Sequence, residues 1–180
     1  MNEQLRRELL AMQEEDQRVL RGLIDSGELQ EQEYHPRMRA VHEKHNARIK
    51  TIIDEHGWPG RSLVGEDGTK AAWLIVQHAV LDTGFMERTL LLLREAVRNG
   101  ETEGWCLAYL QDRVLTMAGE PQIYGTQHDL DKNGLAYPLP IREPDKVVQL
   151  RREIGLEPLS EATQRVQARY RPKNNNPKNS

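Results

Sequence analysis

The chain has 180 residues, enough for one domain, with 37% hydrophobic and 29% charged residues. Its single cysteine, Cys106, excludes an internal disulfide and favours a reducing compartment, so we expect a cytoplasmic protein. The first residues lack the apolar stretch of a secretory signal, and the longest apolar run, 71–76, is too short to span a bilayer. We therefore expect no membrane partner.

The net charge of −3 is unevenly distributed along the chain. From Arg165 onward there are five basic residues and no acidic ones, which leaves 20 basic and 28 acidic residues in the rest of the chain. The excess of acidic residues before Arg165 argues against nucleic acid as the main partner. The tail at 170–180, rich in Asn, Pro and Lys, is expected to be disordered, so the predicted domain covers residues 1–169.

The first half of the chain predicts three helices. Apolar residues at steps of three and four indicate a helix over 3–25, and a second helix begins near Pro36 and ends before the Gly57–Gly60 turn. We expect a loop over 61–68. The third helix, over 69–81, is apolar nearly all round, which is typical of a buried central helix.

The second half predicts two more long helices and then a change of character. Periodicity favours helices over 84–99 and 103–118. Residues 122–127 and 135–139 have strand-like composition around a turn signal at 131–134, which predicts a small hairpin. Two short helices, near 145–154 and 160–169, complete the domain. The predicted fold class is mainly α, a compact helical bundle with a small β-hairpin near residues 121–140.

Polar side chains interrupt the apolar faces of these helices. Asp16, His45 and Asp112 occupy positions where the periodicity calls for an apolar residue. His78 and Asp82 are four residues apart and would be neighbours on one face if the third helix includes both. A buried carboxylate without partners is unfavourable by several kcal/mol, so each of these groups should have a partner.

The spacing of the first two helices suggests one such partnership. Asp16 lies nine residues before Asp25, and His45 lies nine residues after Pro36. In an antiparallel pair both would lie at the same depth, which allows Asp16 to face His42, His45 or Asn46. We expect Asp16, His42 or His45, His78 and Asp112 to converge on one region, because inward polar groups are most stable when they satisfy one another.

Familiar catalytic and cofactor motifs are absent from the sequence. There is no Walker loop, no G-x-G-x-x-G, no G-x-S-x-G, no H-E-x-x-H and no paired C-x-x-C. His78 and Asp82 together with His42 or His45 could bind a metal, but matches this short arise often by chance. We therefore predict neither a metal nor a cofactor.

Several ordered motifs resemble a bacterial family. They are Gly57-Trp58-Pro59-Gly60, Ser62-Leu63-Val64-Gly65, Trp73-x3-Gln77-His78-Ala79, Ala108-Tyr109-Leu110-x-Asp112-Arg113-Val114 and Gln122-x-Tyr124-Gly125-Thr126-Gln127. This set is similar to the family called domain of unknown function 6624, from about Asp16 to Leu159. The resemblance implies no known activity.

The resemblance implies which residues belong to the shared pattern: Asp16, His42, Asn46, Gln77, His78, Asp112, Arg113, Tyr124 and Gln127. The resemblance implies an Asp directly after the His-Ala pair. Here Val80 follows it and Asp82 comes later, which weakens any role for a carboxylate at that place.

The sequence supports two hypotheses of function. The first is an acid–base enzyme, of hydrolase, lyase or isomerase type, acting on a small polar or anionic substrate. His78 would be the base or acid, since an imidazole ordinarily has a pKa near neutrality, with Asp112 or Asp16 orienting it. Arg113 would hold an anionic group, and Tyr124 and Gln127 would donate hydrogen bonds from the hairpin. Gln77, His42 and Asn46 are the other predicted substrate-binding residues.

The second hypothesis is a non-catalytic ligand-binding or protein-interaction module. In that case the polar cluster fixes the register of the helices or binds a ligand without turnover. Solvent access separates the two hypotheses, because a base must reach its substrate, whereas a structural network is sealed. The sequence does not indicate the oligomeric state.

Overall fold

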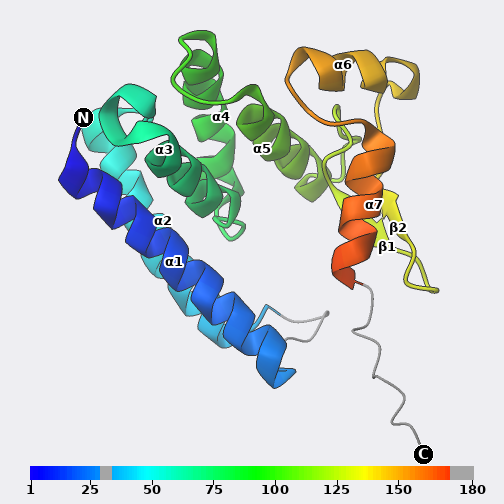
Figure 1. The fold of residues 1–180 in the computed structure, drawn as a ribbon, viewed down its shortest axis with the longest axis horizontal. Helices are drawn as coiled ribbons and strands as arrows, with labels where there is room; N and C mark the ends of the chain where they lie inside the picture. Colours follow the sequence, from blue (N-terminus) through cyan, green and yellow to red (C-terminus); the bar gives the residue numbers. More distant parts are fainter. Residues whose placement is uncertain (29–33, 171–180) are drawn as a thin grey trace, which may run out of the picture. The chain divides into compact units, whose positions relative to one another are not determined.

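The computed structural model describes residues 1–28 and 34–170, and these form a mainly α fold with one small antiparallel hairpin, as predicted (Figure 1). Residue 170 ends the last helix, and the rest of the predicted tail, 171–180, lies outside the described residues. The chain divides into two compact units, Met1–Leu110 and Gln111–Ser180. The single domain over 1–169 stays a prediction.

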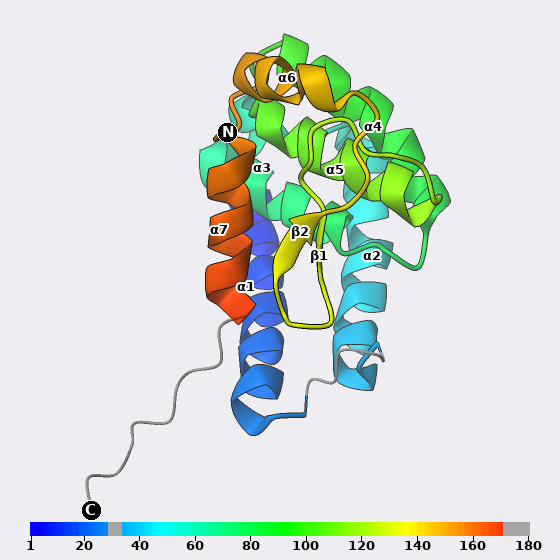
Figure 2. The ribbon, with the colours of Figure 1, turned by 90° about the vertical axis from the view of Figure 1, so that its right-hand side faces the viewer.

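Helices α1 (Glu3–Ser26) and α2 (Pro36–His56) form an antiparallel pair in the first unit (Figures 1 and 2). The side chain of Asn2 accepts a hydrogen bond from the backbone N–H of Leu5 and caps the start of α1. Pro36 lies in the first turn of α2, where its missing N–H costs nothing. Most of the apolar stripe predicted for each helix is buried.

Helix α3 (Arg61–Gln77) is longer at its start and shorter at its end than the sequence predicts. The predicted loop over 61–68 is wrong, because this segment is helical on both sides of Gly65. Gly65 itself has φ 75° and ψ 172°, which interrupts the helix without ending it. Only glycine adopts this backbone region readily, and the sequence signal therefore looked like a loop. The second part of α3 is buried on several sides, as expected of a central helix.

The predicted extension of the third helix to Leu81 is also wrong. His78 is the C-cap residue of α3, and Asp82 is the N-cap of α4 (Thr83–Arg98). The Oδ1 of Asp82 accepts the backbone N–H of Phe85 at 2.9 Å, and its Oδ2 accepts from Lys50 Nζ at 2.5 Å. His78 and Asp82 are therefore not neighbours on one helix face, because a capping aspartate starts a new helix between them.

The remaining elements follow α5 (Gly104–Met117), in which the boundary between the two units falls. The second unit contains β1 (His128–Leu130), β2 (Ala136–Pro138), a 3-10 turn η1 (Pro144–Lys146), α6 (Val147–Glu153) and α7 (Leu159–Tyr170). In the hairpin, His128 pairs with Pro138 and Leu130 with Ala136.

The first strand of the hairpin is not the predicted one. Residues 122–127 form a loop, in which Gln122 makes only an isolated bridge with Ile141. The strand-like composition of this segment led to the wrong prediction, because side-chain hydrogen bonds to its backbone hold it in place and no partner strand among the described residues does. The carboxamide of Gln122, which is fully buried, donates to the carbonyls of Gln127 and Leu139. Arg151 donates to the carbonyl of Tyr124 at 2.6 Å.

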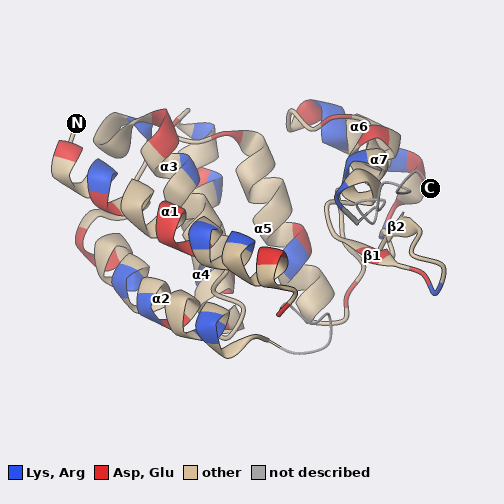
Figure 3. Ribbon diagram, turned by 60° about the horizontal axis from the view of Figure 1, so that its bottom comes forward, with Lys and Arg blue, Asp and Glu red and all other residues tan. Residues whose placement is uncertain are grey.

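Charged residues are unevenly spread over the helices. Both α1 and α2 carry many acidic and basic residues, whereas the charged residues of α5 are Asp112 and Arg113 (Figure 3). No helix among the described residues is at once long and apolar enough to cross a membrane.

Candidate functional site

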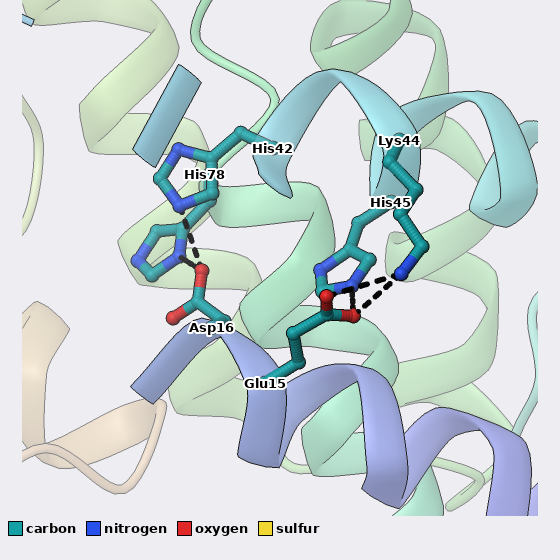
Figure 4. Close-up of polar contacts among 6 residues, drawn as sticks. All are labelled: Glu15, Asp16, His42, Lys44, His45 and His78. Carbon is teal, nitrogen blue, oxygen red and sulfur yellow. Dashed lines mark hydrogen bonds and ion pairs between the residues drawn. The ribbon is translucent and has the colours of Figure 1, made fainter. Parts of the chain in front are cut away.

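Asp16 is the centre of a polar cluster in the first unit. It lies in the middle of α1, and its side chain is only 3% exposed. Its Oδ1 pairs with His42 Nε2 at 2.7 Å and with His78 Nδ1 at 2.8 Å (Figure 4). Both imidazoles thus converge on one carboxylate oxygen, which confirms the predicted convergence for Asp16, His42 and His78. Asp112 belongs to the second unit, and its predicted place in the same region stays a prediction.

Three helices position this cluster. Asp16 takes one position of the buried stripe of α1, and His42 lies opposite it on the antiparallel α2. His78 reaches the same oxygen from the end of α3, where the helix stops and its side chain turns toward α1. The centroids of the two imidazole rings are 4.8 Å apart. The buried carboxylate is therefore shared by groups far apart in the sequence.

The hydrogen bonds around the cluster define one consistent arrangement of protons. Gln17 Nε2 donates to Asp16 Oδ2 at 2.8 Å, and the hydroxyl of Tyr34 contacts Nδ1 of His42. Burial, together with the negative charge of Asp16, raises the pKa of Tyr34 to about 12, so its hydroxyl keeps its proton and donates it. His42 then carries its proton on Nε2, which faces Asp16.

The Asp16 carboxyl is ionised in this arrangement. Burial opposes its ionisation, but the hydrogen bonds from His42 and His78 outweigh burial and hold the pKa of Asp16 well below its usual range. A carboxylate can accept from both imidazoles, as the geometry requires. The cluster therefore holds one negative charge between two imidazoles.

His78 differs from His42 in what its second ring nitrogen contacts. Within the described residues, the Nε2 of His78 has no hydrogen-bond partner, and the side chain is 23% exposed. Both ring nitrogens of His42 have partners, and its side chain is 10% exposed. Of the two imidazoles on Asp16, only His78 thus presents an unoccupied nitrogen.

A model of a family of unknown function, DUF6624, matches residues 3–174. The chain belongs to this family. No curated protein and no solved structure matches the chain. Membership of DUF6624 therefore confirms the resemblance found in the sequence and brings no activity with it.

Two further residues singled out by the resemblance to DUF6624 lie in the first unit. Asn46 follows His42 by one helical turn on α2, and its Oδ1 is buried without a hydrogen-bond partner among the described residues. Gln77 is buried at the last position of α3, next to His78. Their predicted roles in binding a substrate stay predictions.

His45 belongs to a separate pair. Its Nε2 contacts Glu15 Oε2 at 3.0 Å, and Lys44 Nζ lies 2.8 Å from the same oxygen (Figure 4). The helix spacing correctly predicted that Asp16 lies at the level of these α2 residues, and it left open which histidine would face Asp16. Glu15 is the partner of His45 that the sequence did not reveal, because a partly exposed glutamate gives no signal in the periodicity.

Asp112 lies in the second unit, where its carboxylate organises the loop that follows α5. Oδ1 accepts the backbone N–H groups of Ile123 and Tyr124, and Oδ2 accepts the N–H and hydroxyl of Thr126 (at 2.9 and 3.0 Å). The residue is fully buried. These contacts give the inward aspartate of α5 a structural task, and the predicted catalytic role of Asp112 stays a prediction.

The other DUF6624 residues of the second unit lie close to that loop in the sequence. Burial lowers the pKa of Arg113, which follows Asp112 on α5. Tyr124 and Gln127 belong to the loop before β1, so their predicted place in the hairpin is wrong. The carboxamide of Gln127 donates to the hydroxyl of Thr126 at 3.0 Å. The substrate contacts proposed for the three stay predictions.

The cluster on Asp16 could also hold a metal ion. The ligand atoms of Asp16, His42 and His78 all lie within 4.8 Å of one another.

Gln17 and Tyr34, which contact Asp16 and His42, were missed in the sequence because neither interrupts an apolar stripe. Hollows lined by Asn2, Glu8 and Arg48, and by Arg6, Gly65 and Lys70, lie at other places of the first unit.

Proposed function

We propose that the protein is an acid–base enzyme in which His78 is the catalytic base and Asp16 is the residue that positions it. The observation that carries the proposal is the 2.8 Å contact between His78 Nδ1 and Asp16 Oδ1, which leaves Nε2 on a partly exposed side chain. A carboxylate in this place fixes the tautomer of the imidazole and stabilises the imidazolium formed when the other nitrogen takes a proton.

The proposed chemistry begins with proton transfer to Nε2 of His78. The proton comes from a water molecule in a hydrolysis, or from the substrate in an elimination or isomerisation, and it returns to the product from the imidazolium. The substrate is small and polar or anionic. The proposal includes a cytoplasmic location, which the single cysteine favours.

The difference between the two histidines supports a catalytic over a purely structural cluster. Both ring nitrogens of His42 are satisfied, by Asp16 and Tyr34. His45 leaves Nδ1 without a partner among the described residues, but that atom is buried. His78 combines a ring fixed by Asp16 with an Nε2 that has no partner in the described part of the chain, on a partly exposed side chain, which is what a general base requires.

The test compares turnover of simple activated esters. Purified protein is assayed with p-nitrophenyl acetate and p-nitrophenyl phosphate, and its His78→Gln variant is expected to lose about 100-fold or more of kcat/KM because the base is gone. The Asp16→Asn variant keeps an oxygen at the same place but stabilises the imidazolium less, so its kcat falls by at least roughly 10-fold.

The matched control is His45→Gln, which changes a buried histidine on α2 that pairs with Glu15 and not with Asp16. Its kcat/KM should stay within about 2-fold of the parent value, and circular dichroism checks that all variants fold. Turnover that survives His78→Gln contradicts the proposal. Absence of turnover with both esters favours the binding module instead.

A further inference from the structure

We propose that Asp16, His42 and His78 form a binding site for one divalent transition-metal ion of the zinc class. The inference goes beyond the acid–base function and does not rest on it, because binding needs only the three ligand atoms. These are Asp16 Oδ1, His42 Nε2 and His78 Nδ1, which gather from three helices of the first unit.

The distances from the two imidazole nitrogens to Asp16 Oδ1 are near what such an ion requires, and all three ligand atoms lie within 4.8 Å of one another. Tetrahedral zinc with bonds of about 2.0–2.1 Å places its ligand atoms about 3.3 Å apart. The two imidazole nitrogens lie 2.7 and 2.8 Å from Asp16 Oδ1. A retreat of the rings by roughly half an ångström thus makes room for an ion in place of the two hydrogen-bonded protons.

The types of ligand select the class of ion. Two imidazoles and one carboxylate suit zinc and its first-row neighbours, whereas calcium and magnesium prefer oxygen ligands alone. Three protein ligands leave a fourth position open, and the partial exposure of His78 lets water fill it.

The charge of the cluster favours a cation. Asp16 is buried, and the ion pairs that it makes within the described residues are with His42 and His78. No lysine or arginine is among these partners, so in the part of the chain that the structure describes no permanently charged side chain balances the carboxylate. A divalent ion at Oδ1 supplies the missing positive charge.

Outer partners for two of the ligands are already in place. Gln17 Nε2 donates to the second oxygen of Asp16, which fixes the carboxylate with Oδ1 toward the histidines. The hydroxyl of Tyr34 lies at His42 Nδ1. When Nε2 binds the ion, Nδ1 takes the proton and donates it to the Tyr34 oxygen, the kind of support that metal-binding histidines usually have.

The bound ion and the proposed base exclude each other. A metal on Nδ1 of His78 uses the lone pair of that nitrogen, so the ring proton moves to Nε2, the atom that would accept a proton in catalysis. Loading the site therefore turns off His78 as a base. Ion binding itself is measured without any turnover, so the two proposals fail independently.

The experiment is calorimetric titration of the EDTA-treated full chain with Zn²⁺. We expect binding of one ion per chain, and weakening of at least about 10-fold in each of Asp16→Asn, His42→Gln and His78→Gln, since loss of even an outer partner costs 10- to 100-fold. The control is His56→Gln, which removes an exposed histidine beside Glu55 outside the cluster. Its affinity should equal that of the parent.

A second measurement identifies the ligands in the unaltered protein, so the result does not depend on whether the variants fold. Long-range ¹H–¹⁵N spectra should show Zn²⁺ shifting Nε2 of His42 and Nδ1 of His78 and leaving His45 and His56 unchanged. Absence of stoichiometric binding overturns the inference. Binding that is equally tight in His42→Gln and His78→Gln, or shifts confined to other histidines, overturns it as well.

Discussion

Asp112 illustrates how one buried side chain can replace a strand ladder. Its two oxygens accept backbone N–H groups from Ile123, Tyr124 and Thr126. In Asp112→Ala these groups lose their acceptor, and each buried donor left unpaired costs about 1–3 kcal/mol. We expect the free energy of unfolding, measured by urea titration, to fall by roughly 3 kcal/mol or more.

The control for this prediction is Asp129→Ala in the same unit. Asp129 is exposed, and within the described residues its carboxylate accepts only the N–H of its neighbour Leu130, so the loss should be within about 0.5 kcal/mol. Amide exchange should accelerate at residues 123–126 in Asp112→Ala alone. Equal stability of the two variants would refute a structural role for Asp112.

Asp67 makes a prediction about pH. The hydrogen bond from Arg6 lowers the pKa of Asp67 to about 2. Because the folded-state value lies below the ordinary value of about 3.9, the pair stabilises the fold above that ordinary value, and its contribution is lost as the pH falls through about 2. In Arg6→Gln, the carboxyl resonance of Asp67 should titrate near its ordinary value. The side chains of Arg6 and Asp67 are both partly exposed. Added salt should therefore bring the pKa of Asp67 in the parent protein closer to its value in Arg6→Gln. An unchanged midpoint in Arg6→Gln would show that Arg6 is not the cause.

At the scale of elements, Gly65 sets the path of α3. Its φ of 75° and ψ of 172° lie in a region that side chains rarely adopt, and a Cβ there would meet Asp67 Oδ1 at 3.3 Å. Gly65→Ala should therefore lower the free energy of unfolding by about 1–3 kcal/mol in a thermal or urea melt.

Gly22→Ala is the matched control, and we expect it to have the opposite effect on stability. It lies inside α1, where a Cβ would have nothing within 4 Å. Gly22→Ala should stabilise the protein by about 0.5–1 kcal/mol, because glycine is a poor helix former. The same sign of change in both variants would mean that Gly65 is under no conformational constraint.

The elements that the sequence predicts well are those whose order comes from apolar periodicity. Helices α1, α2, α4 and α5 were placed to within a few residues because each buries one stripe. The start of α3 and the position of β1 were missed, because Gly65 permits an unusual backbone and Asp112 holds the following loop through its side chain. Neither the backbone conformation of Gly65 nor the hydrogen bonds of Asp112 produce a signal in the apolar periodicity.

The candidate site was predictable in part for the same reason. Asp16 stood out because it interrupts an apolar stripe, and equal depth on antiparallel helices brought it near His42. The contact with His78 depends on where α3 ends, which propensity locates poorly. Tyr34 and Gln17 join through side-chain contacts alone, so no pattern marks them.

At the scale of the whole molecule, Cys106 reports on folding. Burial raises the pKa of its thiol to about 12, and the side chain is fully buried. At pH 8 its thiolate fraction is on the order of 1,000-fold smaller than that of an ordinary thiol, and only the thiolate reacts. We expect iodoacetamide to leave the native protein unlabelled and to label it in urea at the rate of glutathione, measured by mass spectrometry. Labelling of the native chain at the glutathione rate would show that the first unit opens readily.

The sharing of one Asp16 oxygen has a consequence during synthesis of the chain. The two histidines that reach it are 26 and 62 residues further along the sequence. A growing chain therefore carries Asp16 and His42 well before it carries His78, and the three side chains can meet only after α3 has been made and has packed. Both proposals therefore predict that a chain truncated before residue 78 neither turns over a substrate nor binds the metal ion at this cluster.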